Sequence, residues 1–150
     1  MLDWVAHARQ QAQDRRPDAT LVFIGANEGP SIDGAPCCDS AWIQGYARRV
    51  RQMMRTYERG GISRVYWLTL PAPEDPENVP VFQAVNAAVR LASPALGESG
   101  RVIDLAGALA PGDRFQARYR KEDGVHLNVE GAQIATRMVE RALRRDGVTR

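Results

Sequence analysis

Short apolar runs alternate with helical patterns along this chain, and this alternation limits the fold more than any other feature of the sequence. The runs are residues 19–25 (ATLVFIG), 63–71 (SRVYWLTLP) and 100–106 (GRVIDLA). Continuous apolar runs of this length, rich in β-branched residues, are typical of strands that are buried on both faces, as in parallel sheets. The sequence therefore predicts three parallel strands.

Four stretches around these runs have apolar residues at intervals of three and four, which indicates amphipathic helices. They are residues 2–12, 40–60, 79–93 and 129–144. Strands that alternate with helices through right-handed crossovers give a parallel sheet with helices on both faces. We therefore predict a three-layer α/β fold and expect residues 1–150 to form a single domain.

The composition excludes several classes of function. The 150 residues are 44% hydrophobic and 25% charged, which is typical of a globular domain. A net charge of +2 is too small to indicate a nucleic-acid partner. No apolar run approaches the roughly 20 residues that span a bilayer, and the N-terminus lacks the pattern of a signal peptide. No Gly-x-Gly-x-x-Gly motif follows a strand, which disfavours nucleotide binding.

The two cysteines, Cys37 and Cys38, are adjacent. Neighbouring cysteines seldom pair, because the ring that they would close strains the peptide bond between them. We therefore expect two small side chains in a loop without a disulfide. No third and fourth ligands stand at a recognisable spacing, so no metal site and no cofactor are predicted.

A short motif before the last helix carries the strongest indication of chemistry. Asp123 and His126 lie in the sequence DGVH, at the end of the loop that follows the third predicted strand. Open parallel sheets bind ligands beyond the carboxyl ends of their strands, which is where this loop lies. The pair fits an acid that orients a base, although a turn aspartate and a solvated histidine would have the same pattern. The second histidine, His7, is expected to be structural or solvated.

Two motifs together resemble the SGNH or GDSL superfamily of hydrolases. The sequence GANE (25–28) is similar to the Gly-x-Asn-Asp block of that family, with Glu28 in place of the usual Asp, and DGVH is similar to its Asp-x-x-His block. The resemblance covers about residues 3–144 and is closest to a bacterial branch with cell-envelope members. It implies the C-terminal two thirds of a flavodoxin-like SGNH fold and a periplasmic or extracellular location.

The resemblance also implies an esterase or acyltransferase and assigns roles to four residues. His126 would be the general base and Asp123 would orient it. Asn27 would donate its amide to the oxyanion, and Gly25 would let the backbone turn sharply at the strand end. The implied substrates are O-acyl or O-acetyl esters of carbohydrates or small alcohols, and the chemistry needs no cofactor.

The nucleophile of the family, in a Gly-Asp-Ser block, has no counterpart in this sequence. Three interpretations remain open: a fragment of a longer hydrolase, a nucleophile from a partner chain or second copy that completes the sheet, or an inactive binding or assembly module. The N-terminal strands of the family's fold also have no counterpart in this sequence. Without them, the run 19–25 would be an exposed apolar edge that invites pairing. Ser31 and Cys37 are the candidates for a substitute nucleophile within the chain.

Overall fold

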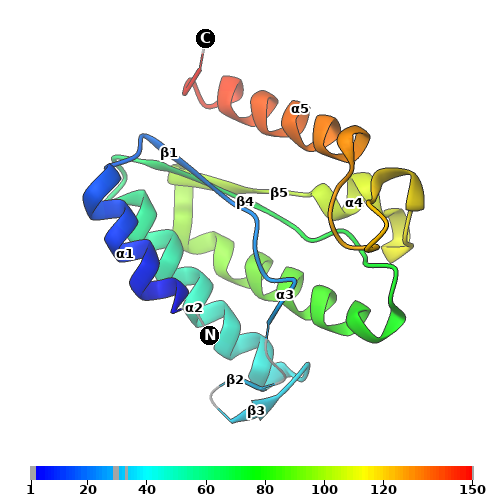
Figure 1. Cartoon of the computed structure of the whole chain (residues 1–150). Coiled ribbons are helices and arrows are strands. Elements are labelled where there is room, and N and C mark those ends of the chain that lie inside the picture. Colours follow the sequence, from blue (N-terminus) through cyan, green and yellow to red (C-terminus); the bar gives the residue numbers. More distant parts are fainter. Residues whose placement is uncertain (1–2, 29–30, 33, 150) are drawn as a thin grey trace.

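A three-stranded parallel sheet forms the centre of the structure, a computed structural model that describes residues 3–28, 31–32 and 34–149. Its strands are β1 (Ala19–Val22), β4 (Arg64–Leu68) and β5 (Gly100–Ile103), in the order β1-β4-β5. The register aligns Ala19 with Arg64, and Val65 with Gly100. The predicted three-layer α/β fold is confirmed (Figure 1).

Helices cover both faces of this sheet (Figure 1). One face is covered by α1 (Trp4–Arg15), α2 (Ser40–Glu58) and α3 (Val79–Ala92), and the other by α4 (Leu105–Leu109) and α5 (Val129–Arg145). Short 3-10 turns span Pro76–Asn78, Ser93–Ser99, Pro111–Asp113 and Ala117–Tyr119. Among the described residues, no helix is both long and apolar enough to cross a membrane.

The central position of β4 in the sheet explains why its residues 65–68 are continuously apolar. Val65 and Trp67 pack with the α1, α2 and α3 layer, whereas Tyr66 and Leu68 pack with the α5 layer. Because successive side chains of a strand point to opposite faces, each helix layer buries alternate side chains of β4. Every one of these four side chains is at most 4% exposed.

Polar side chains cap the N-termini of α1 and α2. The Asp3 carboxylate accepts hydrogen bonds from the backbone of Val5 and Ala6, and Asp39 accepts one from Trp42. Such N-caps satisfy amides that have no partner within the helix. Helix α1 ends at Arg15, three residues beyond the expected end. The next residue, Arg16, adopts a left-handed conformation before Pro17.

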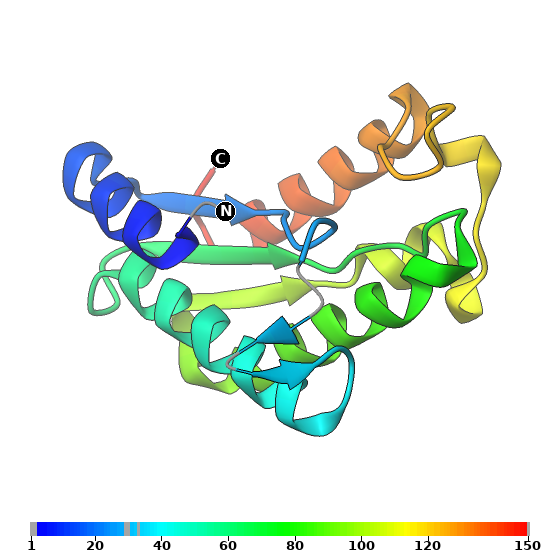
Figure 2. The same ribbon diagram turned by 60° about the horizontal axis from the view of Figure 1, so that its bottom comes forward.

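The strands are shorter than the apolar runs that predicted them, and two further elements were not expected. Residues Ser31–Ile32 (β2) and Ala35–Pro36 (β3) form a small antiparallel hairpin beside α2, in a segment that we expected to be a loop (Figure 2). The third run ends at Ile103 because Asp104 caps α4 by accepting a hydrogen bond from the Gly107 amide.

The expectation of two unpaired cysteines is wrong. Cys37 and Cys38 form a disulfide with each other. The peptide bond between them is cis, and their Cα atoms are 3.0 Å apart. The structure therefore overturns the expectation that strain in the ring would keep the two cysteines unpaired.

The strand β1 lies at the edge of the sheet, as expected from the sequence. Within the described part of the chain it pairs with β4 alone. Leu21 and Phe23, in and just after this strand, are 47% and 44% exposed. The edge therefore combines unpaired backbone groups with exposed apolar side chains, a combination that favours pairing with a further strand.

Candidate functional site

Asp123 and His126 form a directly hydrogen-bonded pair. The Oδ2 atom of Asp123 lies 2.7 Å from Nδ1 of His126. Its Oδ1 atom accepts hydrogen bonds from the backbone amides of Val125 at 2.9 Å and His126 at 2.8 Å. These two backbone bonds, together with that from the His126 ring, lower the pKa of Asp123 to about 2.

This arrangement fixes the chemistry of the imidazole. Because Asp123 is ionised at neutral pH and can only accept, Nδ1 of His126 must carry the proton that they share. In the neutral ring Nε2 then has a free lone pair, the requirement for a general base. The His126 side chain is 76% exposed, so a substrate can reach it.

The loop that holds the pair is tied to the rest of the molecule at several points. The Gly124 carbonyl accepts a hydrogen bond from the Glu74 amide at 3.1 Å. Gly124 has a φ of +67°, and a Cβ atom there would lie 2.4 Å from Cβ of Glu74. The Lys121 amide donates to the carbonyl of His126 at 2.8 Å. The turn is thus specified by a glycine that no other residue could replace without displacing Glu74.

Two residues that the sequence analysis missed support the same loop. The buried Arg120 donates from Nη2 to the carbonyl of Ala72 at 3.0 Å, and its burial lowers the pKa of the guanidinium. Asn128 donates to the carbonyl of Arg118 at 2.7 Å and caps α5 by accepting from the Gly131 amide at 3.0 Å. An Asn directly before a helical pattern is a common N-cap, so Asn128 could have been predicted; the contact of Arg120 has no local signal.

Gly25 and Asn27 lie on the loop that leaves β1. Gly25 has a φ of +123°, and a Cβ atom there would lie 2.7 Å from Cγ1 of Val85. The position therefore requires glycine both for its backbone conformation and for space. The neighbouring Glu28 accepts a hydrogen bond from the Tyr46 hydroxyl at 2.8 Å, and burial raises the pKa of its carboxyl.

A mostly apolar pocket of about 410 Å³ brings the two loops together. Asn27 and Gly25 line it from one side and His126 from another, with Asp123 behind the His126 ring. The remaining lining residues are Trp4, Phe23, Ile24, Ala26, Glu28, Leu70, Pro71, Phe82, Lys121, Val125 and Leu127. No serine, threonine or cysteine is among these described residues.

The two substitute nucleophiles predicted from the sequence are not at this pocket. Ser31 is exposed in the short strand β2 and does not line the pocket. The sulfur of Cys37 is in the disulfide, so this residue has no thiol in the structure. The structure thus brings Asp123, His126, Asn27 and Gly25 together and leaves Ser31 and Cys37 outside.

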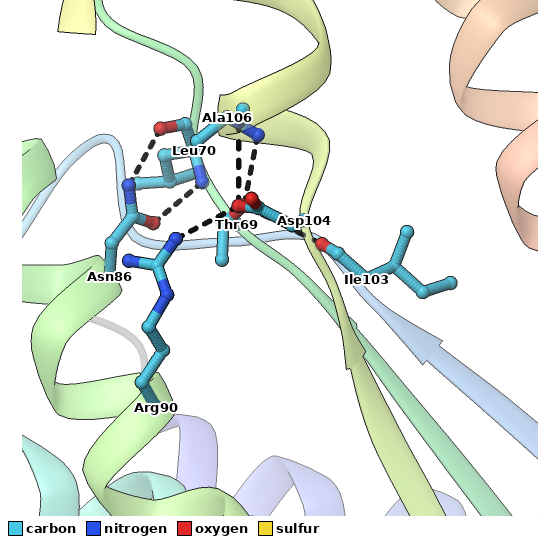
Figure 3. A network of polar contacts seen from close by, with 8 residues as sticks. Thr69, Leu70, Asn86, Arg90, Ile103, Asp104 and Ala106 are labelled. Atoms are coloured by element: carbon cyan, nitrogen blue, oxygen red, sulfur yellow. Dashed lines mark hydrogen bonds and ion pairs between the residues drawn. The ribbon is translucent and has the colours of Figure 1, made fainter. Parts of the chain in front are cut away.

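A polar network lies at the ends of β4 and β5, around Thr69 and Leu70 (Figure 3). The side chain of Asn86 accepts from the Leu70 amide at 2.7 Å and donates to the Leu70 carbonyl at 2.8 Å. Oγ1 of Thr69 lies 3.1 Å from Oδ1 of Asp104 and accepts from the Ala106 amide at 2.9 Å. The Thr69 contacts join the ends of β4 and β5, and the Asn86 contacts tie Leu70, which lines the pocket, to α3.

The comparisons with known proteins agree with this architecture. Residues 1–142 match a family described as "Protein of unknown function (DUF459)". The chain belongs to this family. A solved structure of the lipase/acylhydrolase from Enterococcus faecalis superposes with a TM-score of 0.65 and 18% sequence identity, over 97% of this chain and 72% of that chain. No curated protein matches the sequence.

The similarity to this structure shows that the chain shares the fold of a lipase/acylhydrolase, which agrees with the fold that the two motifs led us to expect. Within the described ranges, the structure has no group of three or more His, Cys, Asp and Glu side chains that could hold a metal ion. The polar side chains that the described residues place at the pocket of this DUF459 member are His126 with its partner Asp123, Asn27, Glu28 and Lys121.

Proposed function

We propose that this chain provides the base and the oxyanion site of an SGNH-type esterase or acyltransferase. The observation that carries the proposal is the 2.7 Å contact between Asp123 and Nδ1 of His126 at the edge of an apolar pocket. The proposed substrates are O-acyl or O-acetyl esters of carbohydrates or small alcohols, whose acyl group would enter that pocket.

The proposed reaction is acyl transfer to a hydroxyl group. Nε2 of His126 takes the proton of the hydroxyl as its oxygen attacks the ester carbonyl, and later gives this proton to the departing alkoxide. Asp123 keeps Nδ1 protonated and stabilises the imidazolium. The side-chain amide of Asn27 donates to the carbonyl oxygen as negative charge develops there.

The nucleophilic hydroxyl is proposed to come from a further segment or a partner chain that pairs with β1. Two observations support this part: the described lining of the pocket contains no hydroxyl or thiol, and the outer edge of β1 has no strand partner among the described residues. The lack of a hydroxyl or thiol among the described lining residues also supports a second candidate, an inactive binding or assembly module on the same scaffold.

The two candidates differ in whether His126 is needed for turnover. The chain would be incubated with p-nitrophenyl butyrate and ethanol, because an added alcohol can replace a nucleophile that another segment supplies. We expect ethyl butyrate to form, and His126→Ala to lower its rate by about 100-fold, the lower end of the usual contribution of a general base. Gas chromatography of the product gives the rate.

The matched control is His7→Ala, which removes the other histidine, on α1, and should leave the rate unchanged. Circular dichroism must show that both variants are folded. Equal rates in the wild type and in folded His126→Ala would reject the enzyme and favour the binding module.

A further inference from the structure

A second surface, on the outside of α1 and α2, is lined by arginines. Two adjoining hollows of about 460 and 450 Å³ share Arg9, and their described lining contains no Asp or Glu. We call them together the arginine groove; its arginines are Arg9, Arg16, Arg48, Arg51, Arg55 and Arg59. Those of α2 follow one another at spacings of three and four residues, so they share one face of the helix.

Several of these guanidinium groups have no counter-charge. Arg9, Arg51 and Arg55 make no ion pair or hydrogen bond with any other described residue. Positive charges that are concentrated on one face repel one another and raise the local concentration of anions. The planar fork of arginine fits the oxygen atoms of a phosphate or a carboxylate.

A further hollow adjoins both the arginine groove and the pocket at His126. Its volume is about 520 Å³. It shares Trp4, Ile24 and Glu28 with the pocket, and Arg9 and Gln52 with the arginine groove. We call this series of adjoining hollows the trough; it begins at the apolar pocket beside the imidazole and ends at Arg9, Arg51 and Arg55.

Among the described residues of this trough, acidic side chains line the connecting hollow and the edge of the pocket but not the arginine groove. They are Asp3 and Glu28, and Glu28 also lies at the edge of the pocket. Glu28 accepts a hydrogen bond from Tyr46, and the nearby Arg49 partly compensates its charge. An anionic group is therefore favoured beyond these carboxylates, at Arg9, Arg51 and Arg55.

We propose that the trough binds an anionic amphiphile: an ester whose acyl group occupies the pocket and whose other end carries a phosphate or carboxylate that contacts the arginine groove. The ester part of this inference rests on the proposed function. The anionic end is a separate requirement, set by the charge of the groove.

Octyl phosphate tests the inference by isothermal titration calorimetry below its critical micelle concentration. Octyl glucoside has the same chain without the charge, and inorganic phosphate has the charge without the chain. We expect octyl phosphate to bind at least about tenfold more tightly than either compound. Equal affinity for octyl phosphate and inorganic phosphate would show that the anion site is not joined to the pocket, and equal affinity for the two octyl compounds would show that the arginines are not used.

The variant Arg51→Gln/Arg55→Gln should weaken octyl phosphate binding by about tenfold and leave octyl glucoside binding unchanged. The matched control, Arg137→Gln/Arg144→Gln, removes the same net charge from α5 on the other face of the sheet. An equal loss of octyl phosphate affinity in the control would show that the effect comes from overall charge, and it would refute binding at the arginine groove. Because octyl phosphate has no ester to hydrolyse, its binding is measured independently of turnover: binding kept without His126-dependent activity would refute the proposed function alone.

Discussion

Replacement of Asn86 by alanine should destabilise the chain by about 4 kcal/mol, because one side chain satisfies two buried backbone groups. Asn86 is 5% exposed, and its amide group bridges the N–H and C=O of Leu70 (Figure 3). Each buried backbone group that loses its partner costs about 1–3 kcal/mol, so the two together cost about 2–6 kcal/mol. At about 2–4 °C per kcal/mol for a chain of this size, the melting temperature should fall by about 8–16 °C.

Urea denaturation followed by circular dichroism measures this loss as a shift of the midpoint at constant slope. The control is Gln83→Ala on the same helix, where the side chain makes only an exposed hydrogen bond to Asp113 and the loss should stay below about 1 kcal/mol. A loss for Asn86→Ala below about 1 kcal/mol would refute the reasoning, since water would then have satisfied both groups of Leu70.

Two further predictions concern stability. Burial, with the hydrogen bond to Asp146, raises the pKa of Tyr66 to about 12. Its contribution to stability is therefore complete below about pH 10, where the tyrosine of the unfolded chain is still protonated, and is lost as the pH rises toward 12. The urea midpoint should fall over this range less steeply in Tyr66→Phe than in the wild type, with some decline left from Tyr46 and Tyr57, whose pKa values are also raised; parallel declines would contradict this assignment. Gly25→Ala should cost roughly 2–3 kcal/mol through its positive φ and the 2.7 Å approach to Val85. Gly60→Ala, at a φ of +71° with no atom within 4 Å of the added Cβ, is the control, and an equal loss in both variants would show that Val85 moves aside without cost.

The layers of the fold could be predicted because their signals are local in the sequence. Residues 65–68 are all apolar because β4 is central: Val65 and Trp67 are buried by one layer and Tyr66 and Leu68 by the other. Asp123 and His126 were also predictable, because a three-residue spacing places their side chains on one turn. The expected meeting of Asn27 and His126 at one pocket followed from the rule that the carboxyl ends of parallel strands share an edge.

Contacts that join distant segments were not predictable in this way. The bond from Arg120 to the Ala72 carbonyl links residues 48 positions apart, and the Asn86 bridge to Leu70 links residues 16 positions apart. Both use a backbone group as the partner, so the sequence contains no complementary side chain that would identify the pair. The disulfide between Cys37 and Cys38 was missed because adjacent cysteines seldom pair, so the sequence pattern argued against it.

Under the proposed function, one added segment would both pair with the exposed edge of β1 and supply the nucleophile that the described pocket lining lacks. Phe23 follows the exposed edge strand β1 and also lines the pocket at His126. A strand that added to β1 in parallel would end at the same edge of the sheet as β1, and the residues after it would then lie over this pocket. The segment that satisfies the unpaired backbone of β1 is therefore the segment best placed to deliver a hydroxyl to Nε2 of His126. On this argument, a peptide or partner chain that protects the β1 amides from hydrogen exchange should also be the one that raises His126-dependent acyl transfer.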